Sequence, residues 1–157
     1  MGDLFPGYVI DTSALIDLWR RHYPRDIFPS LWERLEKLTH SGELIAPQEV
    51  INELEQQHDE LLAWAKKRKF AKELDEEQLN WVSKVLRVFP DLVDEKKAVT
   101  DADPFVVALA GAKGWKVVTS EKRGEKGKRK KIPDACDHYA IKCLSLVDFF
   151  RDKDWNF

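Results

Sequence analysis

The stretch Tyr8-Val9-Ile10-Asp11-Thr12-Ser13-Ala14-Leu15-Ile16 decides the fold. Its first three residues are a short run of β-forming side chains, and the run ends abruptly at Asp11. Apolar residues then return at helical spacing. Thr12 and Ser13 both suit the N-cap position, because their hydroxyls accept hydrogen bonds from the free amides of a first helical turn. The stretch therefore predicts a strand, a tight turn and a helix.

The same alternation of strand and helix continues along the chain. Further strands are predicted over 44–46, 115–119 and 141–144. Helices are predicted over 31–41, 47–54, 61–65, 79–89, 103–112 and 146–151, with a turn or short helix over 132–136. Strands that alternate with helices imply a parallel sheet between helical layers. We therefore predict an α/β fold, a three-layer α/β/α sandwich with a central parallel sheet, as one domain over residues 1–157.

Composition is that of a soluble globular protein. The 157 residues suit about one domain, and 43% are hydrophobic and 34% charged. The longest apolar run, 105–111, is far shorter than the roughly 18 residues that a membrane span needs. Residues 1–6 lack the basic region and apolar stretch of a secretion signal. The expectation is a cytoplasmic protein that is not inserted in a membrane.

Acidic residues stand where the predicted strands end. Asp11 follows the first strand and Glu121 follows the strand near residue 118, and ligands of open α/β sheets bind outside such carboxyl ends. Asp101 and Asp103 open a buried helix, and they reach the same edge if the start of that helix folds back toward it. Glu53 lies about one and a half turns into the helix after the second strand. We expect these carboxylates to gather at one edge.

Such a cluster predicts a bound cation. Two like charges about 4 Å apart repel by about 4 kcal/mol at an effective dielectric constant of ~20, and a divalent cation relieves that repulsion. Ligands that are all oxygen atoms favour Mg²⁺ or Mn²⁺ over zinc. Cys136, His138 and Cys143 match no standard zinc spacing, so two reduced thiols beside the core are expected there.

A basic segment follows Glu121. Seven of the ten residues from Lys122 to Lys131 are basic and one is acidic. One interpretation is a solvated loop. The other is a grip on RNA phosphates that salt weakens through counterion release. The candidate RNA-binding residues are Lys122, Arg123, Lys126, Lys128, Arg129 and Lys130. An acidic centre beside basic residues suits metal-assisted hydrolysis of a phosphodiester.

Four motifs carry a resemblance to a known family. They are Tyr8-Val-Ile-Asp11-Thr-Ser13, Pro47-Gln-Glu-Val-Ile-Asn-Glu53-Leu, Asp103-Pro-Phe-Val-Val-Ala-Leu-Ala110 and Val117-Val-Thr-Ser-Glu121. In this order, over nearly the full length, they resemble the PIN domain ribonucleases. The likeness is greatest to small prokaryotic PIN-like proteins, which include toxins of toxin–antitoxin pairs. The basic insertion after Glu121 departs from the compact toxins.

The resemblance implies roles for particular residues. Asp11, Glu53 and Asp103 match the three acidic metal ligands, and Glu121 stands where the family usually has an Asp. Ser13 matches a small polar residue that supports the first Asp, and Asp101 and Ser120 are expected to support the site. The implied activity is a Mg²⁺- or Mn²⁺-dependent endoribonuclease that leaves 5′-phosphate and 3′-hydroxyl ends. Analogy with the toxins adds a homodimer and a small antitoxin protein as partners.

Other interpretations of the same residues stay open at this point. Residues 11–13 also suit a helix cap, Glu53 a solvated helix face, and Asp101 and Asp103 a helix dipole. Asp134 and Asp137 either complete the site or cap a turn. Haloacid-dehalogenase-like phosphatases also place an Asp after the first strand, but usually with an acid two residues later, where this chain has a serine. A catalytically silent scaffold that binds RNA or protein is the alternative to an enzyme.

Overall fold

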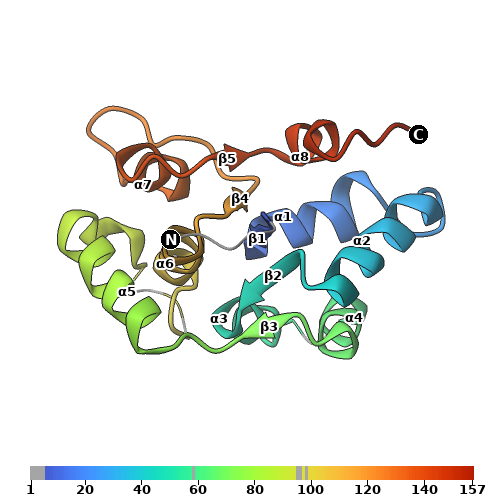
Figure 1. Cartoon of the computed structure of the whole chain (residues 1–157), viewed down its shortest axis with the longest axis horizontal. Helices are drawn as coiled ribbons and strands as arrows, with labels where there is room; N and C mark the ends of the chain where they lie inside the picture. Colours follow the sequence, from blue (N-terminus) through green and yellow to red (C-terminus); the bar gives the residue numbers. More distant parts are fainter. Residues whose placement is uncertain (1–5, 58, 95–96, 98) are drawn as a thin grey trace.

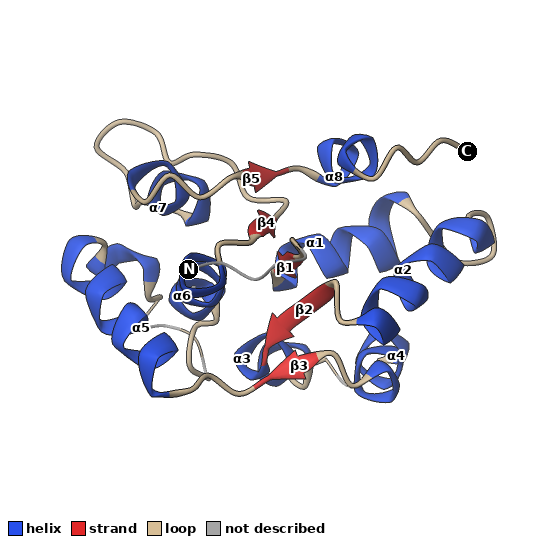
Figure 2. Ribbon diagram, viewed as in Figure 1, coloured by secondary structure: helices blue, strands red, loops and turns tan. Residues whose placement is uncertain are grey.

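The computed structural model describes residues 6–57, 59–94, 97 and 99–157. The prediction that no secretion signal is present concerned residues 1–6, and most of these lie outside the described residues. The described residues form a five-stranded sheet in the order β3-β2-β1-β4-β5, and every neighbouring pair is parallel. The strands are β1 (Tyr8–Ile10), β2 (Leu44–Pro47), β3 (Ala71–Lys72), β4 (Lys116–Val118) and β5 (Cys143–Leu144). The predicted α/β class with a central parallel sheet is confirmed (Figure 2).

Helices cover both faces of this sheet. They are α1 (Thr12–Ile16), η1 (Asp17–His22), α2 (Pro29–Ser41), α3 (Gln48–Leu54), α4 (Glu60–Arg68), α5 (Glu76–Val88), η2 (Pro90–Leu92), α6 (Asp103–Lys113), α7 (Ile132–His138) and α8 (Leu146–Asp152). Helix α6 packs on β1, β2 and β4, with α5 behind it. Figure 1 shows α5, α6 and α7 on one side of the strands and α1, α2 and α4 on the other. The arrangement is consistent with the predicted three-layer sandwich.

Two local predictions were wrong, and one strand was missed. The N-cap of α1 is Asp11, because its carboxylate accepts the amide of Ala14, so Thr12 and Ser13 lie inside the helix with their hydroxyls free for other partners. Pro47 ends β2 in an extended conformation, and the helix starts one residue later. Strand β3 was not predicted, since two residues are too short to show an alternating pattern.

The sheet topology brings two strand ends together at its centre. β1 pairs with β4 in a register that places Ile10 beside Val118, and the Asp11 amide continues the ladder to the Val118 carbonyl at 3.1 Å. The chain order reverses between these strands, since β2 and β3 lie on one side of β1 and β4 and β5 on the other. Such a switch point is where open α/β sheets bind ligands.

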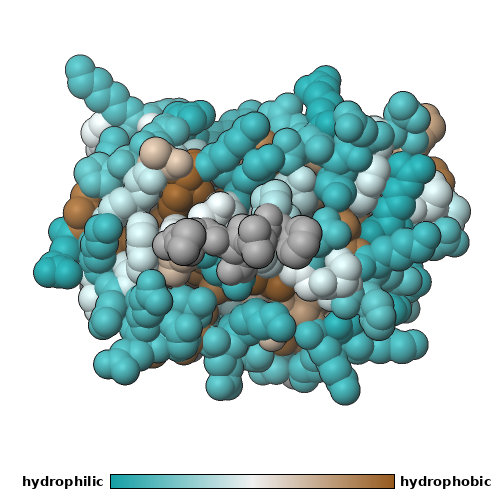
Figure 3. Space-filling model, viewed as in Figure 1, coloured by the Kyte–Doolittle hydropathy of each residue, from teal (hydrophilic) through white to brown (hydrophobic). Residues whose placement is uncertain are grey.

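Aromatic side chains fill much of the core. Trp32 and Trp64 are buried, and Trp19 and Trp81 are partly buried against the core. Hydrophilic residues cover most of the face seen in Figure 3. Among the described residues, no helix has the length and apolar character that crossing a membrane requires.

The C-terminal helix is tied to the sheet by Asp152, and this contact predicts a pH effect on stability. Lys116 Nζ lies 2.7 Å from Asp152 Oδ2 and the Tyr8 hydroxyl lies 2.6 Å from it, so both bonds hold the pKa of Asp152 below its usual range. A carboxyl group whose pKa is lowered in the folded protein stabilises the fold at pH values above its unfolded-state pKa, near 4. This stabilisation is lost as the pH falls through the folded-state pKa.

We therefore expect Asp152→Asn to lower the free energy of unfolding by about 1 kcal/mol at pH 7, as measured by urea unfolding. The difference from the wild type should vanish in acid, where the carboxylate is protonated in both states. Asp148→Asn is the matched control on the same helix, because its pair with Arg151 is more exposed. An equal loss in both variants would contradict the assignment.

Candidate functional site

Asp11 is held at the end of β1 by a set of short-range donors. Ser13 Oγ lies 2.9 Å from both carboxylate oxygens, the Ala14 amide lies 2.9 Å from Oδ1, and the Thr119 hydroxyl donates to Oδ2. The residue is only 2% exposed. Ser13 therefore has the supporting position that the resemblance implied, and it also accepts the Ser120 amide at 3.1 Å, which ties β4 to β1.

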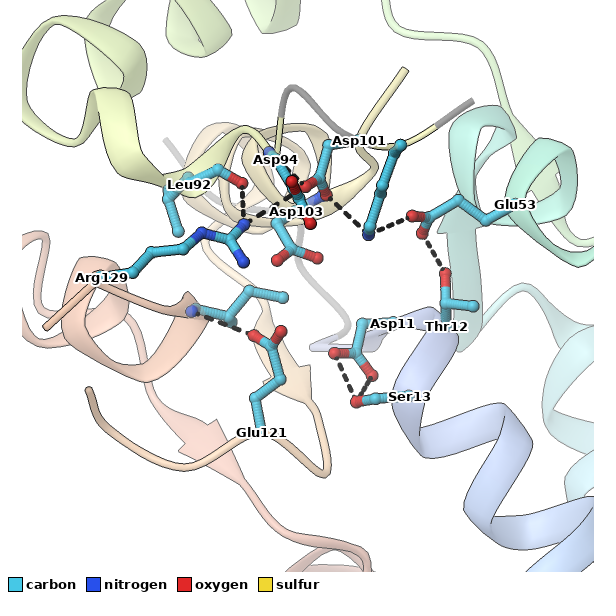
Figure 4. Close-up of polar contacts among 12 residues, drawn as sticks. Asp11, Thr12, Ser13, Glu53, Leu92, Asp94, Asp101, Asp103, Glu121 and Arg129 are labelled. Carbon is cyan, nitrogen blue, oxygen red and sulfur yellow. Dashed lines mark hydrogen bonds and ion pairs between the residues drawn. The ribbon is translucent and has the colours of Figure 1, made fainter. Parts of the chain in front are cut away.

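Asp101 and Asp103 lie at the start of α6, beside the ends of β1 and β4 (Figure 4). Asp101 accepts the amides of Asp94 (2.9 Å) and Asp103 (3.0 Å), so its carboxylate shapes the turn into the helix. Asp103 is 8% exposed. Its carboxylate receives no hydrogen bond from the part of the chain that the structure describes. Of the two, Asp103 has the oxygens left for another ligand.

Glu121 and Glu53 approach the same centre from β4 and α3, as Figure 4 shows. Glu121 Oε2 accepts the Ile132 amide at 3.2 Å. Glu53 uses both oxygens: Thr12 Oγ1 donates to Oε1 and Lys97 Nζ to Oε2, each at 2.6 Å. The structure thus places Asp11, Asp101, Asp103 and Glu121 within electrostatic reach at one edge of the sheet, as predicted, and Glu53 reaches this centre through Lys97, which also contacts Asp101.

Mutual repulsion and burial disturb the protonation of this centre. Burial raises the pKa of Asp103 to about 9, and the charges of Glu121, Asp101 and Asp11 add to the rise. Burial also raises the pKa of Asp11 to about 7, although the hydrogen bonds from Thr119, Ala14 and Ser13 oppose it. These shifts mean that the carboxylates lie within electrostatic reach of one another and lack enough positive charge to offset their burial.

The chemistry of the donor set fits a hard divalent cation. All the candidate ligands are carboxylate oxygens, and Asp103 is buried with no hydrogen-bond donor among the described residues. Within that same part of the chain, no three Asp, Glu, His or Cys side chains are already gathered closely enough to hold a metal ion. Glu53 is drawn toward Lys97 and Glu121 toward the Ile132 amide, so both side chains must shift to share an ion with Asp103.

The basic segment after Glu121 is a loop closed at its base. Asp134 Oδ2 accepts the amides of Gly124 and Lys131, each at 2.8 Å, so this carboxylate caps α7 rather than completing the site. Arg123 forms a two-bond pair with Asp137, at 2.6 and 2.8 Å. The candidate RNA-binding lysines Lys122, Lys126, Lys128 and Lys130 are all exposed.

Arg129 reaches back from this loop to the acidic centre. Its guanidinium donates to the carbonyls of Asp91 (2.5 Å) and Leu92 (3.0 Å) and lies 3.4 Å from Asp101 Oδ2. Arg129 therefore joins the basic loop to η2 and to the turn before α6. Its predicted contact with RNA stays a prediction.

A pocket of about 580 Å³ opens beside Glu121. The ends of β4 and β5 and the start of α8 form its walls, and His22 and Tyr23 close one side. Lys122 and Arg123 also line it. The acidic centre therefore has an adjoining space of the size that holds a small ligand or one unit of a polymer.

Sequence reasoning missed three residues of the centre. Thr119 was identifiable in principle, since it directly follows a buried strand beside Asp11. Thr12 was assigned to a helix cap, although its hydroxyl binds Glu53. No local sequence pattern indicates a role for Lys97, because its partner Glu53 lies 44 positions earlier in the chain.

Comparison with known proteins assigns the chain to a family without a described activity. No curated protein matches the chain. The model of a family described as a domain of unknown function, DUF4411, matches residues 8–157. Because the match covers nearly the whole chain, this protein belongs to the DUF4411 family.

Proposed function

We propose that this protein is a metal-dependent endoribonuclease that uses Mg²⁺ or Mn²⁺. The observation that supports the proposal most is Asp103: a buried carboxyl group without a hydrogen-bond donor among the described residues, within electrostatic reach of Asp11 and Glu121. A cation bound to such a group would stabilise the folded protein by offsetting the negative charge. The resemblance to PIN domain ribonucleases adds the reaction type.

Each residue of the centre has a proposed task. Asp11, Asp103, Glu121 and Glu53 would hold the ion. When bound, the ion supplies a water of lowered pKa as the nucleophile and offsets charge on the scissile phosphate. Ser13 and Thr119 hold Asp11 in one orientation through its two oxygens, and Asp101 fixes the start of the helix that carries Asp103.

The proposed substrate is single-stranded or looped RNA. The exposed lysines of the basic loop would contact phosphates, and the pocket beside Glu121 would receive a nucleotide next to the scissile bond. The homodimer, the antitoxin partner and the cytoplasmic location stay predictions.

The proposal predicts that RNA cleavage depends on a divalent metal. Purified protein should cleave a single-stranded RNA in the presence of Mn²⁺, and excess EDTA should slow cleavage at least a hundredfold because the carboxylates alone cannot activate water. EDTA saturated beforehand with Mg²⁺ serves as the control for nonspecific effects of the chelator. Equal rates with EDTA, without EDTA and in Asp11→Asn would remove the proposal.

A catalytically silent RNA-binding scaffold is the second candidate. It is favoured by the observation that no three potential metal ligands stand ready together among the described residues. A scaffold of this kind would bind RNA without cutting it, and Mn²⁺ would not raise its melting temperature. Metal titration followed by thermal unfolding separates the two candidates.

A further inference from the structure

We propose that the ammonium group of Lys97 competes with the metal ion for Glu53, so that an internal cation of the protein holds the site in its metal-free form. The inference rests on the proposed function, since it concerns the metal site of that reaction. It assigns a role to a residue that neither the motifs nor the family match singled out.

Lys97 lies among the acids of the centre. Its Nζ is 2.6 Å from Glu53 Oε2 and 3.3 Å from Asp101 Oδ1. The usual pKa of a lysine ammonium is about 10.4. The side chain is therefore a fixed positive charge at neutral pH, at a place where the proposed ion would also bind.

Both carboxylate oxygens of Glu53 already accept a hydrogen bond. Thr12 donates to Oε1 and Lys97 to Oε2, and the Glu53 side chain is only 9% exposed. A carboxylate oxygen that accepts one hydrogen bond still has a second lone pair, so these hydrogen bonds alone do not exclude a divalent cation. Lys97 is the donor whose charge also opposes the cation, because like charges at such short range repel.

For a metal ion to replace the Lys97 ammonium group at Glu53, the lysine side chain must be able to move away from Glu53. Its side chain is 37% exposed, whereas the side chain of Asp101 is fully buried and holds two backbone amides. Lys97 is thus free to turn toward solvent without breaking the turn that Asp101 shapes. Binding of the metal and pairing of Lys97 with Glu53 then oppose each other, because both place positive charge at the same carboxylate, so each weakens the other by the same factor.

The test is the affinity of the whole protein for Mn²⁺ alone, in three variants. Lys97→Met removes the charge and keeps the length of the side chain, and it should bind Mn²⁺ roughly tenfold more tightly than the wild type. Lys97→Arg keeps the charge and should bind with wild-type affinity or more weakly. Lys37→Met, on the exposed face of α2, is the matched control for net charge and should bind as the wild type does.

Two readouts serve this test: Mn²⁺ binding measured by electron paramagnetic resonance, and the melting temperature across a Mn²⁺ titration. In EDTA, Lys97→Met should melt below the wild type, because Glu53 loses its counter-charge, and Mn²⁺ should reverse the loss. If Lys97→Met does not fold in EDTA, Lys97→Gln removes the same charge and keeps a donor for Glu53.

Failure of this inference differs from failure of the proposed function. If the wild type binds Mn²⁺ and cuts RNA, but neither neutral variant binds Mn²⁺ more tightly, the competition is refuted and the nuclease proposal stands. If no variant binds Mn²⁺, both are refuted. If a neutral variant alone binds it, the competition is supported and the wild type is not a Mn²⁺-dependent nuclease under those conditions.

Discussion

Asp103→Asn is expected to reduce metal-dependent RNA cleavage at least a hundredfold while it stabilises the metal-free protein. The carboxylate is buried, receives no hydrogen bond from the described residues and faces Asp11 and Glu121 (Figure 4). An amide of the same shape gives the ion a neutral oxygen in place of a charged one. Loss of a group that acts on the transition state costs about 10²–10³ in rate.

The stability gain follows from the protonation of Asp103. Its pKa in the folded protein is about 9, above the usual value near 4. A carboxyl group whose pKa is raised in the folded protein destabilises the fold at pH values above its unfolded-state pKa. The cost in folding free energy grows as the pH rises toward 9. In EDTA we expect Asp103→Asn to be more stable than the wild type by at least about 1 kcal/mol at pH 8, and the difference to shrink as the pH falls toward 4.

The matched control is Asp26→Asn, which removes one exposed carboxylate from the turn before α2. It should leave both cleavage and stability unchanged. Loss of cleavage together with loss of stability in Asp103→Asn would point to a damaged fold, and full cleavage would exclude Asp103 as a metal ligand. Rates are measured as kcat/KM at saturating Mn²⁺, and stabilities by urea unfolding.

The second large effect is expected in the core. Trp32 is 1% exposed and donates its Nε1 hydrogen to the Tyr23 carbonyl at 2.7 Å. Its ring meets those of Trp19 and Trp64 edge-on, with centroids 5.1 Å away in both cases. Removal of a buried tryptophan leaves a cavity and an unpaired carbonyl, so Trp32→Ala should cost about 3–5 kcal/mol in urea unfolding.

Trp32→Phe separates packing from hydrogen bonding. It keeps an aromatic ring and loses the donor to Tyr23, so its cost should be clearly below that of alanine. Both variants should cleave RNA at the wild-type rate per folded molecule, because the tryptophan cluster has no part in the proposed chemistry. A cost below 1 kcal/mol for Trp32→Ala would mean that the cluster does not stabilise the fold.

Periodicity and local chemistry were enough to predict most of the fold. Strand β1 covers Tyr8–Ile10 as predicted, and α6, predicted over 103–112, runs from Asp103 to Lys113, with Pro104 near its start and Gly114 directly after its end. These signals are local: side-chain alternation, the restricted backbone of proline and the left-handed φ of 71° at Gly114. Strand β3 was missed because two residues carry no period.

The position of Asp11 and Glu121 was also predictable from sequence. Both follow strands directly, and parallel strands end at one edge of a sheet, so only strand adjacency was left undetermined. The position of Asp103 could not be predicted from the strand ends alone, because it depends on the direction in which α6 crosses the sheet. That direction is set by burial of the helix against β1, β2 and β4.

The amino-acid sequence by itself determined the fold class, the chain order of the strands and helices and the kind of atoms in the acidic centre, because neighbours in the chain decide those. Tertiary structure alone decided which partner each carboxylate has: Glu53 meets Lys97, and Arg129 turns to Asp101. These pairs join distant residues, and their geometry follows from the packing of whole elements, which no local pattern encodes.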